Sequence, residues 1–317
     1  MSALGQAPGL GNMPGPDNET DWPRPARLTV GVISAGRVGS ALGAALERAG
    51  HVVTAVAAIS EASLDRARTR LPDTPVRPAV EVAAGAELLI LAVPDTELEG
   101  LVRGLAASDV SFRSRIVLHT SGAQGIGVLA PLAARGAICL AIHPAMTFTG
   151  HEGDVDRLIS ACFGITAPDE VGFAIAQSLV LEIGGEPVHV PEANRTLYHA
   201  ALAHGANHLV TLVNDAVAAL SHALDGQGLL DQDAAAGVPQ RILAPLLSAA
   251  LDNALRYGDA ALTGPVARGD ADAVARHLRV LEQDDTRIAA SYRALSLRTA
   301  QRIGASPELI EQLEELQ

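Results

Sequence analysis

Residues 28–50 place the strongest constraint on the fold of this chain, because they combine a strand, a tight turn and a helix in one short segment. The segment reads LTVGVISAGRVGSALGAALERAG. Its β-branched apolar run up to Ile33 predicts a buried strand, and the alanine- and leucine-rich stretch up to Gly50 predicts a helix. Small residues connect the two. A strand, turn and helix of this kind can hold an anionic diphosphate at the helix N-terminus.

The turn contains two glycines with separate expected roles. Gly36 would let the backbone approach a diphosphate, and Gly39 would let the helix pack close to the strand. Ser34 occupies the place of the first glycine of the usual G-x-G-x-x-G pattern. A structural glycine turn therefore remains the alternative to a dinucleotide site, and the agreement of strand, turn and helix favours the site. The cofactor-binding residues predicted here are Ser34, Ala35, Gly36, Arg37, Val38 and Gly39.

The composition excludes several kinds of chemistry. The chain has no lysine, which excludes a Schiff-base lysine, a Walker lysine and a lysine general acid. Its net charge of −13 argues against a nucleic-acid partner. Cys139 and Cys162 lie in apolar, strand-like segments and are too few for a zinc site or a disulfide scaffold. We therefore expect reduced thiols in a cytoplasmic protein.

The sequence predicts no membrane-spanning segment. No apolar run in the sequence reaches membrane-spanning length, so we expect no membrane partner. Residues 1–26 are rich in glycine, proline and asparagine and show little apolar patterning. They predict a disordered tail, and they lack the basic and apolar regions of a signal peptide.

Strand and helix patterns alternate over residues 27–190, and this alternation predicts an α/β Rossmann domain with a doubly wound parallel sheet. Helical periodicity alone is present over residues 191–317, which predicts an all-α C-terminal domain that begins with a long helix at residues 193–224. The predicted strands are apolar runs at residues 30–33, 52–59, 87–93, 115–119, 138–142, 162–166 and 187–190.

Polar side chains follow three of the predicted strands. Val93 and Pro94 precede an aspartate, His119 is followed by Thr-Ser-Gly with Ser121 in its middle, and His143 precedes a proline. The carboxyl ends of parallel strands face one crevice, so these residues would lie near the glycine turn, beside a nicotinamide ring. A histidine with its ordinary pKa of about 6.5 can donate a proton near neutral pH. Either histidine alone favours the interpretation as a hydrogen-bonded loop residue, whereas two at adjacent strand ends favour catalysis.

The end of the second predicted strand distinguishes the two nicotinamide dinucleotides. A carboxylate there binds the ribose hydroxyls and repels a 2′-phosphate. In this sequence Ser60 stands at the tip, followed by Glu61. Ser60 can bond a phosphate oxygen while Arg37 or Arg66 neutralises it, which favours NADP over NAD. Ser60 also suits the N-cap of the next helix, and the two roles are compatible.

The long predicted helix carries a stripe of polar residues. Asn207 and Asn214 lie a heptad apart, and so on one face, with alanines beside them. His204 and His208 have the spacing of a metal-binding pair. No acidic residue accompanies them in the H-E-x-x-H manner, so we expect no metal and interpret them as surface or interface residues.

Residues 262–270 form a polar turn that leads into a further helix. This turn is either a plain interhelical loop or a segment that reaches the crevice. In the second case Arg268 would bind an anionic substrate, with Thr263 beside it.

A resemblance to a known family rests on six segments. The chain contains, in this order, VGVISAGRVGSALGAAL, LLILAVPD, VLHTSGAQG, AIHPAMTFTG, NRTLYHAALAHGANHLV and LTGPVARGD. With these it resembles a bacterial family of Rossmann-like oxidoreductases that carry a C-terminal helical domain of unknown function. The family is similar in plan to the 6-phosphogluconate dehydrogenase superfamily, which includes pyrroline-5-carboxylate reductase and ketopantoate reductase. The resemblance covers nearly everything after the tail. It implies NAD(P) binding, a helical domain that completes the active site, and a homodimer formed through that domain.

The sequence departs from the superfamily in its catalytic residues as well as in the turn. In the β-hydroxyacid dehydrogenase and ketopantoate reductase branches, a lysine one turn before an asparagine serves in catalysis. If Asn207 matches that asparagine, Ala203 occupies the position of the lysine. Acid–base chemistry then falls to His119, His143 or His199, or is absent.

We therefore expect an NADP-dependent reductase of a small carbonyl or imine compound, for example a 2-keto acid such as 2-dehydropantoate. His143 or His119 would supply the proton, Asn207 and Ser121 would orient the substrate, and Arg268 would bind its carboxylate. A non-catalytic NADP-binding sensor or assembly protein is the alternative, and the missing lysine supports it. A methyltransferase is a third interpretation, against which the added helical domain argues.

Overall fold

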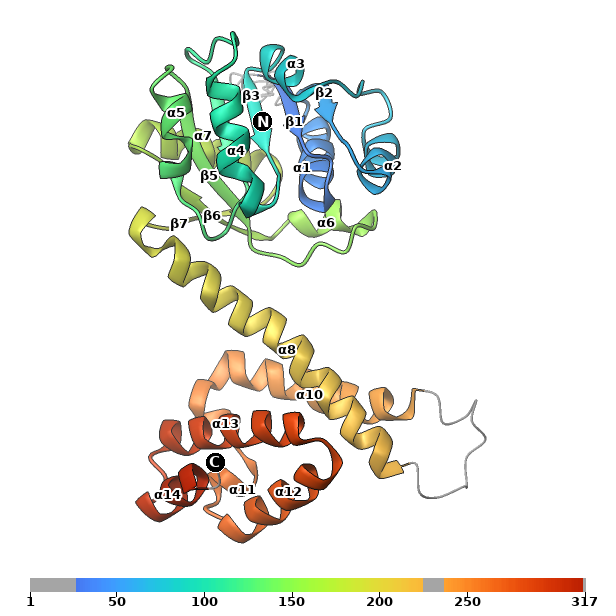
Figure 1. Ribbon diagram of the computed structural model, residues 1–317, viewed down its shortest axis with the longest axis vertical. Coiled ribbons are helices and arrows are strands. Elements are labelled where there is room, and N and C mark those ends of the chain that lie inside the picture. The colour runs from blue at the N-terminus through green and yellow to red at the C-terminus, as the bar shows by residue number, and fades with distance from the viewer. Residues whose placement is uncertain (1–26, 225–236, 316–317) are drawn as a thin grey trace, which may run out of the picture. The chain divides into compact units, whose positions relative to one another are not determined.

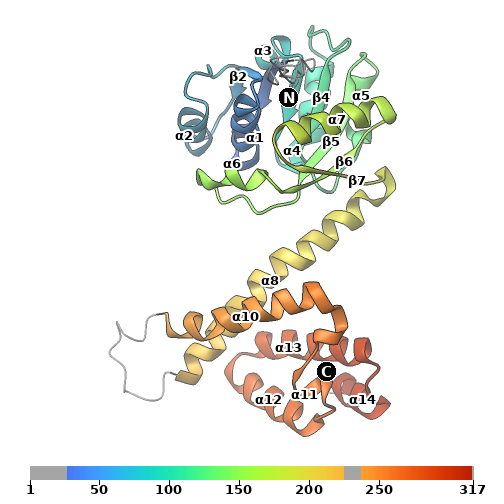
Figure 2. The ribbon, with the colours of Figure 1, turned by 180° about the vertical axis from the view of Figure 1, so that it is seen from behind.

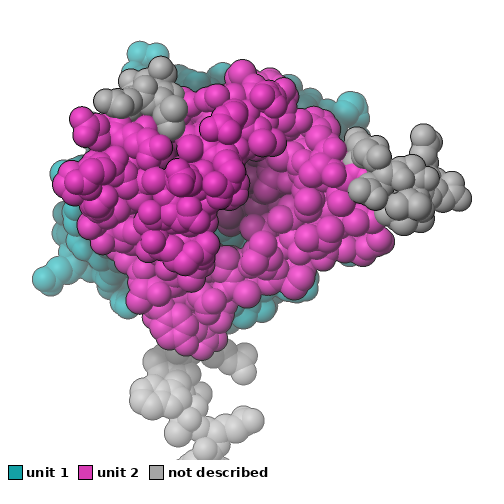
Figure 3. Space-filling view, turned by 90° about the horizontal axis from the view of Figure 1, so that it is seen from below, with its two compact units in different colours: residues 1–200 teal, residues 201–317 magenta. Residues whose placement is uncertain are grey.

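The computed structural model describes residues 27–224 and 237–315, and it divides the chain into two compact units, residues 1–200 and 201–317 (Figure 1). The boundary between the units falls within the long helix α8 (Arg195–Leu224), ten residues after the end of the domain expected at residue 190. Residues 1–26, for which we expected disorder, lie outside the described residues. Figure 3 colours the two units separately.

Unit 1 is built on a seven-stranded sheet with the order β2-β1-β3-β4-β5-β6-β7. Neighbouring strands are parallel except for β5 and β6. The prediction of a doubly wound Rossmann-like sheet is thus confirmed. The strands are β1 (Thr29–Ile33), β2 (Val52–Ala57), β3 (Leu88–Leu91), β4 (Ile116–His119), β5 (Ile138–Pro144), β6 (Cys162–Thr166) and β7 (Glu186–His189).

The pairing of β5 with β6 corrects the expectation of an entirely parallel sheet. His143 of β5 lies opposite Gly164 of β6 in an antiparallel register. The connection between them, residues 145–161, begins and ends at the same edge of the sheet, so the chain re-enters the sheet in the opposite direction. It contains a short helix that the sequence pattern did not reveal, α6 (Gly153–Leu158), whose six residues are too few to show a helical period.

Helices cover both faces of the sheet (Figure 1, Figure 2). One face carries α1 (Arg37–Arg48) and α7 (Glu170–Glu182), and the other carries α3 (Ala79–Ala84), α4 (Asp95–Ala106) and α5 (Ala130–Ala133). A further helix, α2 (Glu61–Arg70), packs against α1.

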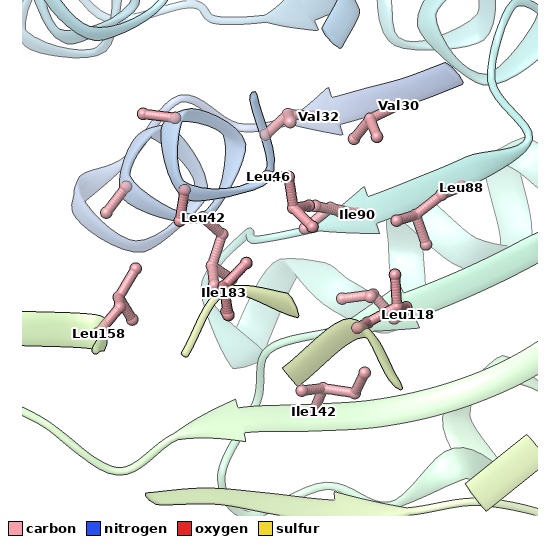
Figure 4. Packing of buried hydrophobic residues seen from close by; sticks show 14 of the residues in the cluster. Val30, Val32, Leu42, Leu46, Leu88, Ile90, Leu118, Ile142, Leu158 and Ile183 are labelled. Atoms are coloured by element: carbon pink, nitrogen blue, oxygen red, sulfur yellow. The ribbon is translucent and has the colours of Figure 1, made fainter. Parts of the chain in front are cut away.

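The apolar core explains why the central strands read as continuous hydrophobic runs. All four side chains of β3 are buried, because a central parallel strand faces helices on both sides. Figure 4 shows the core on the α1 face, where Leu42 and Leu46 of α1 meet Ile90 and Leu118 of the sheet.

The turn between β1 and α1 brings helix and strand into close contact. A Cβ atom at Gly39 would overlap the carbonyl oxygen of Ser34 and lie 2.9 Å from the Cβ of Ala92, which confirms the expected packing role of Gly39. Ser34 has a φ of 79°, in the left-handed region, where a glycine is less strained than a serine. At Gly36, by contrast, a Cβ would lie 3.5 Å from the Oγ of Ser34. The described residues therefore leave space beside Gly36.

Unit 2 is helical throughout its described residues, as predicted. Its core joins α11 to α14 through a small apolar cluster that includes Val266, Leu278 and Leu313. The structure forms a short helix within the turn at residues 262–270. The helices after α8 are α10 (Val238–Tyr257), η3 (Gly258–Ala261), α11 (Gly264–Ala267), α12 (Ala271–Asp284), α13 (Thr286–Ile303) and α14 (Pro307–Glu315).

Among the described residues, no helix combines the length and the apolar character needed to cross a membrane.

The contact at Gly39 predicts a large difference between two glycine substitutions. Gly39→Ala forces a methyl group against backbone, and we expect it to lower the free energy of unfolding by about 2 kcal/mol or more. The second substitution is Gly100→Ala. Gly100 is an exposed residue inside α4, and a Cβ added there meets no described atom within 4 Å. It should raise the free energy of unfolding by about 0.5 kcal/mol through helix propensity. Urea titrations of the two variants measure both effects, and equal midpoints would contradict the close contact.

Candidate active site

An open pocket of about 440 Å³ lies at the carboxyl ends of β1, β3, β4 and β5 in unit 1. The chain passes from β1 outward to β2 and then returns to the other side of β1 as β3. This reversal is a topological switch point, the place where open α/β sheets bind ligands. The residues that line the pocket are Ser34, Gly36, Val38, Ala92, Val93, Pro94, Asp95, Thr120, Ser121, Gly122, His143 and His199.

One wall of the pocket is the N-terminus of α1. Gly36 is the N-cap, and the first turn of the helix contains no acidic side chain. The first amides of a helix have no acceptor within it, so they and the helix dipole attract an anion. The turn itself is fixed to β2, because the amides of Ser34 and Ala35 both donate to the carbonyl oxygen of Ala57.

Cationic and hydroxyl groups flank this turn outside the lining of the pocket. Ser60 is the N-cap of α2 and accepts from the Ser63 amide at 3.3 Å, so its expected capping role is confirmed. Arg66 donates through Nε to the carbonyl oxygen of Ala35 at 3.4 Å. Arg37 is exposed at the start of α1 and donates to the carbonyl oxygen of Phe148 at 3.4 Å. An anion beyond the turn would therefore meet guanidinium groups from two helices.

His119 is buried at the end of β4, and both of its ring nitrogens bind the loop that follows. Nε2 donates to the carbonyl oxygen of Gly125 at 2.9 Å, and Nδ1 accepts from the amide of Ser121 at 3.2 Å. Burial lowers the pKa of His119 to about 4. This histidine holds the loop in place and has no nitrogen left for a substrate.

His143, at the end of β5, does reach the pocket. Its Nδ1 lies 3.0 Å from the hydroxyl of Tyr198, and its ring meets the ring of His199 edge-on with centroids 5.9 Å apart. Burial lowers the pKa of His143 to about 4, and the nearby Arg195 and His199 act in the same direction. The imidazole is therefore neutral at neutral pH.

Gly122 explains how two imidazoles fit beside the loop after β4. A Cβ at this position would lie 2.5 Å from Cδ2 of His199 and 2.9 Å from Nε2 of His143. Any larger residue at this position would displace one of the rings. Ser121, next to it, is buried, and its Oγ accepts from the amide of Gln124 at 3.0 Å. The hydroxyl predicted to orient a substrate therefore already stabilises the loop.

Two charged residues that the sequence analysis missed hold the site together. Arg195 is buried at the start of α8 and donates to three carbonyl oxygens, those of Gln124 at 3.0 Å, Gly164 at 3.1 Å and Ser121 at 2.5 Å. Burial lowers its pKa. Glu192 accepts from the amides at the start of the loop helix η1 (Ile126–Leu129), at 2.8 and 3.0 Å. A charged residue at a helix start is usually solvated, so the sequence gave no sign that Arg195 is buried.

The remaining predicted site residues lie in unit 2. Asn207 is exposed on α8, Thr263 is the N-cap of α11, and Arg268 is exposed at its end. His204 and His208 face each other with their Nδ1 atoms 2.9 Å apart. Within residues 27–224 and 237–315, no group of three or more metal-ligating side chains comes together.

Comparison with family models assigns most of the chain. Residues 13–144 match a Rossmann-like domain, and residues 161–299 match a domain of unknown function, DUF2520. No curated protein sequence matches the chain.

Solved structures share the fold over nearly their whole length. A candidate NADP oxidoreductase from Bacteroides fragilis is 20% identical with a TM-score of 0.71, over 87% of this chain and 98% of that one. An imine reductase from Streptomyces aurantiacus is 14% identical with a TM-score of 0.56, over 91% and 99% of the two chains. A pyrroline carboxylate reductase from Plasmodium falciparum, solved with NADP bound, is 10% identical with a TM-score of 0.51, over 87% and 98%.

These matches agree with the family resemblance found in the sequence, in which a Rossmann-like domain is followed by a helical domain of unknown function. The chain joins a Rossmann-like domain to a domain of the DUF2520 family.

Proposed function

We propose that the protein is an NADP-dependent reductase that acts on a small carbonyl or imine compound. The observation that carries the proposal is the pocket at the switch point, where an open helix N-terminus and two imidazoles face the same space. The names of two structural neighbours, an imine reductase and a pyrroline carboxylate reductase with NADP bound, support this reaction class. Small 2-keto acids such as 2-dehydropantoate belong to the same class of acceptors.

The chain's own residues fit a dinucleotide. The space beside Gly36 and the free amides of α1 suit a diphosphate, and Ala35 and Gly39 give the turn its shape. We assign a 2′-phosphate to Ser60, Arg37 and Arg66, and NAD remains compatible with the turn.

The apolar lining of the pocket suits the reacting end of the cofactor. Val38, Val93 and Pro94 provide this apolar surface. When bound, the nicotinamide supplies the hydride.

We assign the acid–base chemistry to His143 and His199, the two imidazoles of the pocket. Because His143 is neutral at neutral pH, it serves as a hydrogen-bond partner of the substrate rather than as a cationic acid. His119 and Ser121 hold the loop between β4 and η1. Substrate roles for Asn207, Thr263 and Arg268 rest on the sequence patterns of the long helix and of the turn at residues 262–270.

The exposed apolar face of unit 2 supports a homodimer. In α10 the side chains of Ile242, Leu246, Leu251 and Leu255 are between 48% and 80% exposed. The same unit has a mostly apolar groove of about 900 Å³, and Figure 3 shows a hollow on its surface. A helix that is apolar on several sides is normally covered. A second copy of the chain would cover both copies of this helix in a two-fold arrangement.

Calorimetry with NADPH and NADH tests the cofactor assignment. We expect NADPH to bind more tightly, and Gly36→Asp to weaken NADPH binding by about 100-fold or more, because a carboxylate at the helix N-terminus repels the diphosphate. Gly100→Asp, with the same change in charge on exposed α4, is the control and should bind like the original chain. The turn has room for the new side chain, so the melting temperature of Gly36→Asp should not fall.

Turnover then separates a reductase from a binding protein. NADPH oxidation is followed against a panel of 2-keto acids, cyclic imines and aldehyde–amine mixtures. Tight NADPH binding with no oxidation across the panel would favour a non-catalytic sensor or assembly protein. The absence of binding to either nucleotide would overturn the proposal.

The two buried histidines predict a loss of stability in acid. Their pKa values of about 4 in the folded chain lie below the ordinary 6.5, so the unfolded chain binds more protons between these pH values. The free energy of unfolding should therefore fall as the pH drops through this window, by up to about 3 kcal/mol for each histidine. His119→Gln removes one of the two titrating imidazoles. The free energy of unfolding, measured in urea, should then depend less steeply on pH in this variant. His204→Gln, at an exposed site, is the control, and identical slopes for both variants would contradict the prediction.

Charged substitutions on α10 should separate the two copies. We expect Leu246→Asp to give a monomer by light scattering while NADPH binding by unit 1 persists. Val171→Asp, at an exposed position of α7, is the matched control and should leave the mass of the original chain unchanged. A monomeric original chain would refute the dimer.

A further inference from the structure

The hydroxyl of Tyr198 is the hydrogen-bond partner that the structure describes for the side chain of His143, and the function proposed above gives it no role. It lies in the first turn of α8, while His143 belongs to β5. The hydroxyl oxygen is 3.0 Å from Nδ1, and the two rings meet edge-on with centroids 5.6 Å apart. The contact thus joins the start of the long helix to the edge of the sheet that carries the pocket.

The hydroxyl of Tyr198 is held from several sides. A Cβ at Gly164 would lie 2.6 Å from this oxygen, so a glycine on β6 is what admits the phenol. The guanidinium of Arg195 lies over the phenol ring at 5.6 Å. Arg195 in turn donates to the Gly164 carbonyl oxygen at 3.1 Å. Tyr198 is therefore fixed relative to His143 before any ligand binds.

The protonation states of the pair follow from burial. Burial raises the pKa of Tyr198 and lowers the pKa of His143 to about 4, so a neutral phenol faces a neutral imidazole at neutral pH. Among the described residues, Nδ1 of His143 is the one hydrogen-bond acceptor recorded for the phenol, so the phenol proton goes to Nδ1. An Nδ1 that accepts this proton carries none of its own, which leaves the ring hydrogen on Nε2.

Nε2 is the nitrogen that points to the pocket. It lies beside Gly122, a lining residue, at the position where an added Cβ would approach to 2.9 Å. A proton on Nε2 makes this atom a hydrogen-bond donor toward a carbonyl oxygen or an imine nitrogen in the pocket.

We propose that Tyr198 is a positioning residue that fixes His143 in the tautomer with hydrogen on Nε2, so that the imidazole presents a donor to the bound substrate. The use of this donor rests on the proposed reductase function, but the tautomer is a property of the ligand-free chain. The reverse arrangement, in which Nδ1 donates to the phenol oxygen and Nε2 accepts, is the alternative that experiment must exclude.

Nitrogen-15 NMR of the histidine side chains in the full chain tests the proposal. For His143 of the original chain we expect an unprotonated Nδ1 and a protonated Nε2. In Tyr198→Phe the two nitrogen shifts should converge, because the tautomers interconvert once the hydroxyl is lost. An unprotonated Nε2 in the original chain, or unchanged shifts in Tyr198→Phe, would overturn the proposal.

Unit 2 offers a matched control. Tyr292 places its hydroxyl 2.9 Å from Nδ1 of His277, an equivalent pair on α13 and α12. Tyr292→Phe should change the shifts of His277 and leave those of His143 unchanged. Gly164→Ala is a second variant that keeps the phenol but pushes its oxygen away, and it should reproduce the change at His143.

NADPH calorimetry on the same variants separates the two proposals. Tyr198→Phe leaves the turn at α1 intact, so its affinity for NADPH should equal that of the original chain. If NADPH fails to bind the original chain, the reductase proposal fails and the tautomer result still stands. If NADPH binds and the tautomer does not depend on Tyr198, the positioning role alone is refuted.

Discussion

The buried guanidinium of Arg195 is the interaction on which the geometry of the pocket depends. It donates to carbonyl oxygens of the loop after β4 and of β6, and so fixes both to the start of α8. A buried charge is expensive unless its donors are satisfied, and here three carbonyl dipoles satisfy them. Removing this side chain would leave those carbonyls without their partner. The position of Tyr198 and His199, in the turn of α8 that Arg195 begins, follows from this anchor.

The fold was largely predictable from the sequence, because its signals are local. Strand segments, the glycine turn and the helical second half each show in the sequence pattern, and the alternation of strands and helices predicts a doubly wound sheet. The direction of β6 was not predictable, since it depends on where the connection of residues 145–161 returns to the sheet. The short helix α6 in that connection has too few residues for a periodic pattern.

The site was predictable in its position and less so in the roles of its residues. Strand ends placed Ser34, Val93, Ser121 and His143 at one edge, and the structure brings them to one pocket. The sequence could not separate His119 from His143, because both end a strand and the difference lies in their neighbours. Both ring nitrogens of His119 are hydrogen-bonded to the backbone, whereas Nε2 of His143 faces the pocket. The role of Arg195 was not predictable for a similar reason, because the segments that bury it lie far away in the sequence.

The left-handed backbone at Ser34 has a consequence for how the turn balances stability against binding. A serine with φ of 79° is strained by about 1 kcal/mol relative to a relaxed backbone, and a glycine would remove that strain. The serine adds a hydroxyl to the pocket wall that a glycine lacks. A serine in this turn thus costs backbone strain and adds a hydrogen-bonding group. A ligand that hydrogen-bonds to this hydroxyl would offset part of the energetic cost, although the backbone of Ser34 would keep its left-handed conformation.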